Sequence, residues 1–213
     1  MRHHSINKQA KGYSFEEVLL MGLAPDGGLF MPDRIPKMPR KFFENLTNYS
    51  FHQIAGAVSA KFIESIPKAK LSSIIKKAFD FPIPLIKLQK NLYVLELFHG
   101  PTMAFKDFGA RFMARIFGHF LQKRSQKVRI ITATSGDTGS AVASGFFGVP
   151  NVEVYILYPS GKVSPLQEKQ LTTFGGNIVA LEVKGSFDDC QRLAKRALLD
   201  LSRPSATLPS PGE

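Results

Sequence analysis

The sequence predicts an α/β protein in which a helical N-terminal region precedes strand–helix units that form a parallel sheet. Helical periodicity without clear strands dominates the first third of the 213 residues. After Pro84, short apolar runs alternate with helical patterns. The hydrophobic content of 44% is ordinary for a globular protein, so the chain can bury a sizeable core.

The N-terminal region, residues 1–85, is expected to be helical and poor in strands. Ser14 and Glu17 have the spacing of a capping box, which predicts a helix that begins after Ser14 and stops at Gly22. Prolines and glycines then predict a turn and an extended stretch. Further amphipathic helices are expected at residues 51–66 and 71–79.

The remainder of the chain reads as four strand–helix units. The expected strands are residues 93–97, 128–133, 152–158 and 178–183, and the expected helices are residues 104–122, 138–147, 164–174 and 187–200. We assign residues 86–122 to a segment of a large domain and residues 123–200 to a smaller α/β domain. The proline-containing tail, residues 201–213, has no periodicity and is expected to be disordered. Ligands of such sheets gather at the C-terminal ends of the strands.

Charge and composition narrow the function classes. The 28 Lys and Arg residues exceed the 17 Asp and Glu residues and give a formal net charge of +11, which can attract nucleic acid, a membrane surface or a phosphorylated metabolite. The basic residues are scattered, so we interpret them as a solvated surface and place nucleic-acid binding last. No apolar run has the length of a membrane span and the N-terminus lacks a secretory signal core. A cytoplasmic protein with no membrane partner is therefore expected.

Cysteine and histidine usage argues against a metal site. The single cysteine, Cys190, excludes an internal disulfide and suits a reducing compartment, and its helical context favours a structural thiol. His3 and His4 are too isolated to bind a metal. We therefore expect no metal centre.

Lys106 lies where the first predicted strand gives way to a helix. A lysine in the first turn of a helix faces the positive end of the helix dipole, which disfavours the ammonium form and favours the free amine that an imine requires. The alternative is an ordinary first-turn lysine without a function, because the neighbouring Asp107 could offset the field of the helix dipole. For His99 in the preceding loop, a packed loop histidine is favoured over an acid or base.

A glycine-containing turn follows the second predicted strand, at Thr134–Ser140. Small side chains let its backbone amides approach an anion, and Ser135 and Thr138 add hydroxyl groups beside Gly136. Asp137 is acidic, so it more plausibly orients another group than binds the anion. The alternative is an ordinary helix start capped by Asp137 or Thr138. A lysine together with an anion-binding turn suggests pyridoxal 5'-phosphate.

A third candidate loop follows the third predicted strand. Lys162 and Ser164 could meet a phosphate group at the start of a helix. The alternative is a plain capped helix with Ser164 as N-cap, Pro165 at the first position and Gln167 closing a capping box. Both interpretations can hold together.

Four stretches of the sequence together resemble the threonine synthases of the bacterial and fungal type. They are residues 22–30, 98–108, 134–141 and 158–170, in the family's order. The resemblance implies the tryptophan-synthase-like fold, also called fold type II, and pyridoxal phosphate as cofactor. It implies that Lys106 forms the covalent bond with the cofactor, and that Ser135, Gly136, Asp137 and Thr138 lie near the cofactor's hydroxyl side.

The same resemblance implies the reaction. The implied substrate is O-phospho-L-homoserine, which reacts with water to give L-threonine and phosphate in threonine biosynthesis. Protons leave the alpha and then the beta carbon, phosphate leaves the gamma carbon, and water adds at the beta carbon. Lys106 would carry the proton, Thr134 and Ser135 would bind the substrate carboxylate, and Lys162 and Ser164 would contact its phosphate end.

The resemblance extends from about residue 5 to residue 200, whereas family members continue for about as long again. The family's early Ser-Thr-Arg triplet appears here as Ser5-Ile6-Asn7. We therefore expect an incomplete portion that binds the cofactor weakly or not at all and does not turn over the substrate. Two alternatives stay open: a threonine synthase-like phospholyase with a related phosphorylated substrate, and a non-catalytic fragment that binds partners through exposed core surface.

Overall fold

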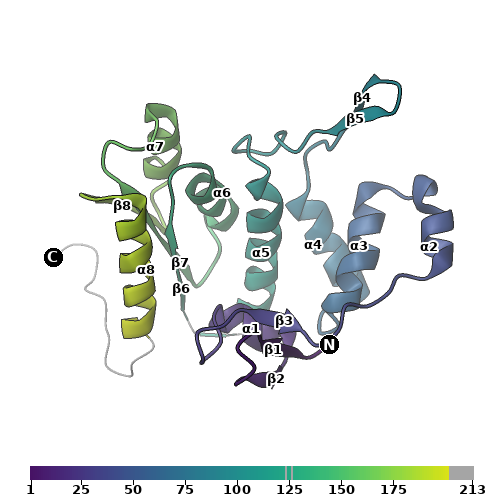
Figure 1. Cartoon of the computed structure of the whole chain (residues 1–213), viewed down its shortest axis with the longest axis horizontal. Helices are drawn as coiled ribbons and strands as arrows, with labels where there is room; N and C mark the ends of the chain where they lie inside the picture. Colours follow the sequence, from purple (N-terminus) through teal and green to yellow (C-terminus); the bar gives the residue numbers. More distant parts are fainter. Residues whose placement is uncertain (123, 126, 202–213) are drawn as a thin grey trace. The chain divides into compact units, whose positions relative to one another are not determined.

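The computed structural model describes residues 1–122, 124–125 and 127–201, in two compact units (Figure 1). The described part of unit 1 comprises residues 1–96 and 115–122, and that of unit 2 comprises residues 97–114, 124–125 and 127–201. The expected disordered tail lies, apart from its first residue, outside the described residues. The expected domain boundaries at residues 85 and 122 stay predictions.

Unit 1 opens with a small antiparallel sheet that the sequence did not predict. Its strands, in the order β2-β1-β3, are β1 (His3–Ser5), β2 (Lys11–Tyr13) and β3 (Phe30–Pro32). Each strand has three residues, which is too short to show an alternating pattern. The expectation of a helical region therefore missed this sheet.

Helices form most of the remainder of unit 1. They are α1 (Phe15–Met21), α2 (Arg40–Glu44), the 3-10 helix η1 (Leu46–Asn48), α3 (Phe51–Phe62) and α4 (Lys68–Ala78). The capping box of Ser14 and Glu17 at the start of α1 is confirmed. Helix α4 starts directly after Pro67 and buries an apolar face against α3. The helix expected from residue 71 thus begins three residues earlier, because Lys68, Ala69 and Lys70 carry no large apolar side chain that would show the periodicity.

A two-stranded antiparallel hairpin closes the first segment of unit 1. It consists of β4 (Leu85–Gln89) and β5 (Leu92–Leu95), joined through Asn91 in a left-handed conformation with φ of 61°. The prediction that a strand at residues 93–97 begins the parallel sheet is therefore wrong. An apolar run does not reveal which neighbour it pairs with, and the short connection to β4 decides the pairing here.

The sheet of unit 2 is parallel, as predicted. Its strands, in the order β6-β7-β8, are β6 (Val128–Ala133), β7 (Val152–Pro159) and β8 (Ile178–Val183). Helix α6 (Asp137–Phe146) connects β6 to β7, α7 (Pro165–Thr172) connects β7 to β8, and α8 (Phe187–Leu201) follows β8. The central strand β7 is the most deeply buried, and α8 packs against β6 and β7 (Figure 1).

Helix α5 (Lys106–Leu121) contributes its first half to unit 2. A Cβ atom added at Gly145 of α6 would lie 3.0 Å from the backbone carbonyl of Ala110. The two helices therefore approach each other closely at a point one turn after Lys106. Among the described residues, no helix has both the length and the apolar character needed to cross a membrane.

Candidate functional site

Lys106 is the first residue of α5, close to the predicted helix start. Its ammonium group lies 4.8 Å from the centre of the Phe105 ring. The side chain is half-buried, and it makes no ion pair with any residue that the structure describes. The amine is therefore held at a helix N-terminus beside an aromatic ring and without a neutralising carboxylate.

Asp107 organises the loop that leads into α5, which the sequence did not reveal. Its side chain is 0% exposed, and its two carboxylate oxygens accept hydrogen bonds from the backbone N–H of Thr102 (2.9 Å) and the Thr102 hydroxyl (2.8 Å). A Cβ atom at Gly100 would collide with this carboxylate, so only glycine fits there. His99 in the same loop is exposed, so the prediction of a packed histidine is wrong.

Thr134 forms the centre of the glycine-containing turn after β6. Its buried hydroxyl oxygen accepts hydrogen bonds from the backbone N–H of Gly136 (3.0 Å) and of Gly139 (2.9 Å), and the hydroxyl donates to the carbonyl of Gly136 (3.1 Å). The hydroxyl is fully used within the turn. Thr134 therefore shapes the turn, and its expected contact with substrate stays a prediction.

Gly136 gives the turn a backbone conformation that other residues rarely adopt. Its φ is 152° and its ψ is −102°, and a Cβ atom there would lie 2.4 Å from the side-chain nitrogen of Gln167. Gly136 is also the N-cap of α6, where no side chain caps the helix. The alternative of a helix start capped by Asp137 or Thr138 is therefore wrong.

The first turn of α6 offers hydrogen-bond donors to an anion. Within the described part of the chain, no protein group accepts a hydrogen bond from the backbone N–H of Asp137 or Thr138. The side chains of Ser135, Asp137 and Thr138 are exposed. Free amides at the positive end of a helix are suited to a carboxylate or phosphate group.

Gln167 links this turn to the start of α7. Its side-chain nitrogen donates to a carboxylate oxygen of Asp137 (2.9 Å), and its side-chain oxygen accepts from the Ser164 hydroxyl (3.0 Å). The Ser164 hydroxyl oxygen also accepts from the backbone N–H of Gln167 (3.3 Å), as predicted for an N-cap. The expected full capping box is wrong, because the Gln167 amide turns toward Asp137 and not toward the backbone of Ser164.

Two of the predicted loops lie at the same edge of the parallel sheet. Ala133 at the end of β6 is in register with Leu157 near the end of β7, and both chains then enter these loops. Lys162 is exposed in the second loop, and in the described part of the chain it makes no ion pair. Lys106 does not follow a strand of this sheet, so the prediction that its loop follows the first strand of the parallel sheet is wrong.

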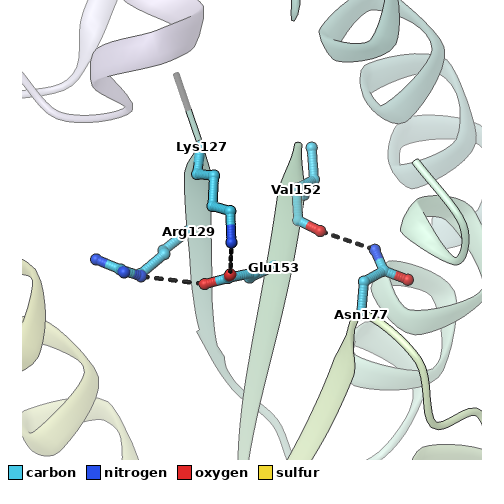
Figure 2. Close-up of polar contacts among 5 residues, drawn as sticks. All are labelled: Lys127, Arg129, Val152, Glu153 and Asn177. Atoms are coloured by element: carbon cyan, nitrogen blue, oxygen red, sulfur yellow. Dashed lines mark hydrogen bonds and ion pairs between the residues drawn. The ribbon is translucent and has the colours of Figure 1, made fainter. Parts of the chain in front are cut away.

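A second cluster lies near the start of β6 and β7 (Figure 2). Glu153 accepts hydrogen bonds from the side chains of Lys127 (3.2 Å) and Arg129 (3.1 Å). Partial burial opposes the charged form of Glu153, but these two cations outweigh it and lower the pKa of Glu153. The Asn177 amide donates to the carbonyl of Val152 (2.9 Å). These groups satisfy one another's hydrogen-bonding capacity, and they lie beside an open hollow of about 400 Å³. We therefore interpret the cluster as structural.

The described residues also contain no group of three or more His, Cys, Asp or Glu side chains that could hold a metal ion. The candidate site therefore consists of the Lys106 amine and the linked loops around Gly136 and Ser164. In the described part of the chain, no hydrogen bond or ion pair joins Lys106 to those loops.

Comparison with known proteins relates the chain to two protein families. The family described as "Threonine synthase N terminus" matches residues 2–79, and the family described as "Pyridoxal-phosphate dependent enzyme" matches residues 79–213. A threonine synthase of Buchnera aphidicola is 45% identical over 202 residues, which are 94% of this chain and 47% of the relative.

Solved structures show the same relation. The chain superposes on a threonine synthase from Escherichia coli with a TM-score of 0.86 and 42% identity, covering 94% of this chain and 46% of the other. A threonine synthase from Brucella melitensis with bound pyridoxal phosphate gives a TM-score of 0.85 and 39% identity, covering 94% of this chain and 45% of the other. The chain thus spans about half the length of the proteins it matches.

Proposed function

Because the chain belongs to the family of pyridoxal-phosphate-dependent enzymes and carries the threonine synthase N-terminal region, we propose that it serves the conversion of O-phospho-L-homoserine and water to L-threonine and phosphate. Pyridoxal phosphate is the cofactor of this family. A cytoplasmic location is part of the proposal, since the reaction uses a phosphorylated amino acid and the lone Cys190 suits a reducing compartment.

The observation that carries this proposal is the turn at the start of α6. Among the described residues, it presents two backbone N–H groups without protein acceptors. The Thr134 hydroxyl accepts a hydrogen bond from its backbone, and the Gln167 amide donates one to the Asp137 side chain. An amino acid substrate brings a carboxylate, and the cofactor brings a hydroxyl group and a phosphate. The donors of the turn and the unpaired amine of Lys106 fit such groups.

We assign the covalent attachment of the cofactor to the Lys106 amine. When bound, pyridoxal phosphate supplies an electron sink for proton loss from carbon atoms near the substrate nitrogen. Lys106 holds the cofactor before the reaction and carries a proton to and from substrate carbon atoms during it. The ring of Phe105 lies 4.8 Å from the amine and offers it a cation–π contact while the cofactor is absent.

We assign the substrate's carboxylate to Ser135 and the amides of the turn, and the cofactor's hydroxyl side to the segment Ser135–Thr138. The Asp137 carboxylate faces Gln167, so it orients the turn. Lys162 is the cation for the phosphate end of the substrate. Ser164 serves that end by starting α7, because its hydroxyl already contacts Gln167.

A chimeric enzyme tests these roles, since the chain spans about half of its relatives. Residues 1–200 replace the matching segment of the E. coli threonine synthase, and release of phosphate and formation of threonine from O-phospho-L-homoserine are measured. We expect turnover by the chimera and none by the 213-residue chain alone. Mass spectrometry of the product separates threonine from the product of a related phospholyase.

Borohydride reduction followed by peptide mapping identifies the lysine that carries the cofactor. We expect the label at Lys106 in the chimera, its loss in Lys106→Arg, and its retention in the matched control Lys162→Arg, which should instead show a raised KM. Labelling of another lysine, or normal turnover by Lys106→Arg, would contradict the assignment.

A further inference from the structure

Asp107 is a buried carboxylate to which the roles assigned above give no part. Among the described residues it makes no ion pair, although a buried carboxylate costs free energy unless its oxygens are satisfied. Both of its oxygens accept hydrogen bonds from one residue, Thr102, through the backbone N–H (2.9 Å) and the hydroxyl (2.8 Å). These two bonds close the segment 102–107 into a loop, and Lys106 lies within it.

The backbone of this loop is shaped around the carboxylate. A Cβ atom at Gly100 would overlap the Asp107 carboxylate, so a larger residue there would displace it. Met103 has a φ of 58°, in the left-handed region that residues other than glycine adopt rarely. Its side chain is 75% exposed, so packing of that side chain does not impose the conformation. Such strain persists where surrounding contacts impose it, and the bonds from Thr102 to Asp107 are contacts of this kind.

The same loop fixes the place where α5 begins. The backbone N–H of Asp107 donates to the carbonyl of the buried Ala104 (3.0 Å), so Asp107 joins the helix to the loop through both its backbone and its side chain. Lys106 makes a ring contact with the exposed Phe105 and no ion pair with any described residue. The position of its amine therefore depends on the backbone that Asp107 holds.

We propose that Asp107 is a positioning residue for Lys106. Its carboxylate faces Thr102, and through these two hydrogen bonds it holds the first turn of α5 so that the amine approaches the cofactor in one orientation. The covalent bond forms when the amine nitrogen adds to the aldehyde carbon of the cofactor and water leaves, so the direction of approach decides how readily it forms. The proposal rests on the assignment of the cofactor to Lys106.

The alternative is that Asp107 acts on Lys106 through its negative charge. The substitution Asp107→Asn separates the two roles, because it removes the charge and keeps the hydrogen bonds. The asparagine oxygen accepts from the N–H of Thr102, and its NH₂ group donates to the Thr102 hydroxyl oxygen. Asp107→Ala removes both bonds, and Thr102→Val removes the bond of the hydroxyl alone.

The first arm of the test uses the full chain without cofactor. Asp107→Ala should accelerate hydrogen exchange of the Thr102 amide at least tenfold, whereas Asp107→Asn should stay within threefold of the parent. The second arm uses the chimera of residues 1–200 with pyridoxal phosphate. In Asp107→Ala the circular dichroism of the cofactor band per bound cofactor should fall at least threefold, and kcat should fall at least tenfold while KM changes less than threefold.

Asn177→Ala is the matched control in unit 2, because it removes hydrogen bonds to Phe146 and Val152 and none in the loop of Asp107. It should lower the melting temperature and leave the dichroism per bound cofactor and kcat within twofold of the parent. All variants are compared at a temperature at which each is folded. If Asp107→Ala does not fold, Thr102→Val replaces it with losses in the same direction, which Thr102→Ser should restore.

Losses of equal size in Asp107→Asn and Asp107→Ala would assign the effect to the charge and overturn the proposal. Parent-like dichroism and kcat in Asp107→Ala would overturn it as well. A parent chimera without label at Lys106 after borohydride reduction would contradict the proposed function instead. The exchange of the Thr102 amide uses neither cofactor nor substrate, so that failure would leave the first arm unchanged.

Discussion

Replacing Gly136 with alanine tests whether the anion-binding turn depends on its unusual backbone. The residue has a φ of 152°, and a new Cβ atom would lie 2.4 Å from the Gln167 side-chain nitrogen. Holding a residue with a side chain in a sparsely populated conformation costs about 1–3 kcal/mol. Displacing Gln167 also removes its hydrogen bond to Asp137, which at an exposed site is worth about 0.5–1.5 kcal/mol.

The expected destabilisation of unit 2 is therefore roughly 1.5–4.5 kcal/mol. Native-state hydrogen exchange of the amides of β7, the buried central strand, measures the free energy of opening of unit 2. Exchange there should accelerate by roughly 10- to 1,600-fold, since about 1.4 kcal/mol corresponds to a factor of ten.

Gly109 provides a matched control, because it lies within α5 and a Cβ atom there would meet no other atom within 4 Å. Gly109→Ala should slow exchange, since alanine in a helix is more stable than glycine by about 0.5–1 kcal/mol. In Gly136→Ala/Gln167→Ala the second substitution should add less than it does alone, because the hydrogen bond is already lost. Exchange in Gly136→Ala within twofold of the parent would refute this account of the turn.

Three further perturbations address unit 2. Asn177→Ala leaves the carbonyls of Phe146 and Val152 and the N–H of Gly148 without their side-chain partner, so urea denaturation should show a loss of about 1–3 kcal/mol, and an unchanged midpoint would contradict the role of this amide. Hydrogen bonds from Ser186 and Arg192 lower the pKa of Asp189. Its carboxylate therefore stabilises the start of α8 fully at pH values above the ordinary aspartate pKa of about 3.9, and this stabilisation is lost as the pH falls below that value. The difference in melting temperature between the parent and Asp189→Asn should therefore shrink from about pH 6 to about pH 2, and a constant difference would rule out this linkage. Cys190 is 0% exposed, and its pKa is raised by burial and, to a smaller extent, by the Asp189 charge. A thiol reagent should therefore modify Cys190 about a hundredfold more slowly in the folded chain than in urea, and equal rates would contradict this expectation.

Local sequence patterns predicted the elements whose signals lie within a few residues. The capping box of Ser14 and Glu17 defined the start of α1, and the apolar runs of β6, β7 and β8 predicted a parallel sheet because its strands are buried. The start of α5 at Lys106 lies two residues after the predicted start.

Features that depend on distant pairing were missed or wrong. The strands β1, β2 and β3 are too short to give a pattern, and β5 pairs with β4 and not with the parallel sheet. In the candidate site, the residues of the turn and of the Ser164 loop were predicted separately. The hydrogen bond from Gln167 to Asp137, which links the two loops across 30 residues of sequence, was not predicted.

The sequence by itself determined the candidate amine, the glycine-containing turn and the order of the strand–helix units, because periodicity, capping and backbone freedom are properties of neighbouring residues. Only the tertiary structure decided which strand pairs with which, and that the Thr134 hydroxyl and the Gln167 amide hold the turn from two sides. These contacts depend on where separate segments meet in space, and a residue's type and neighbours do not specify that position.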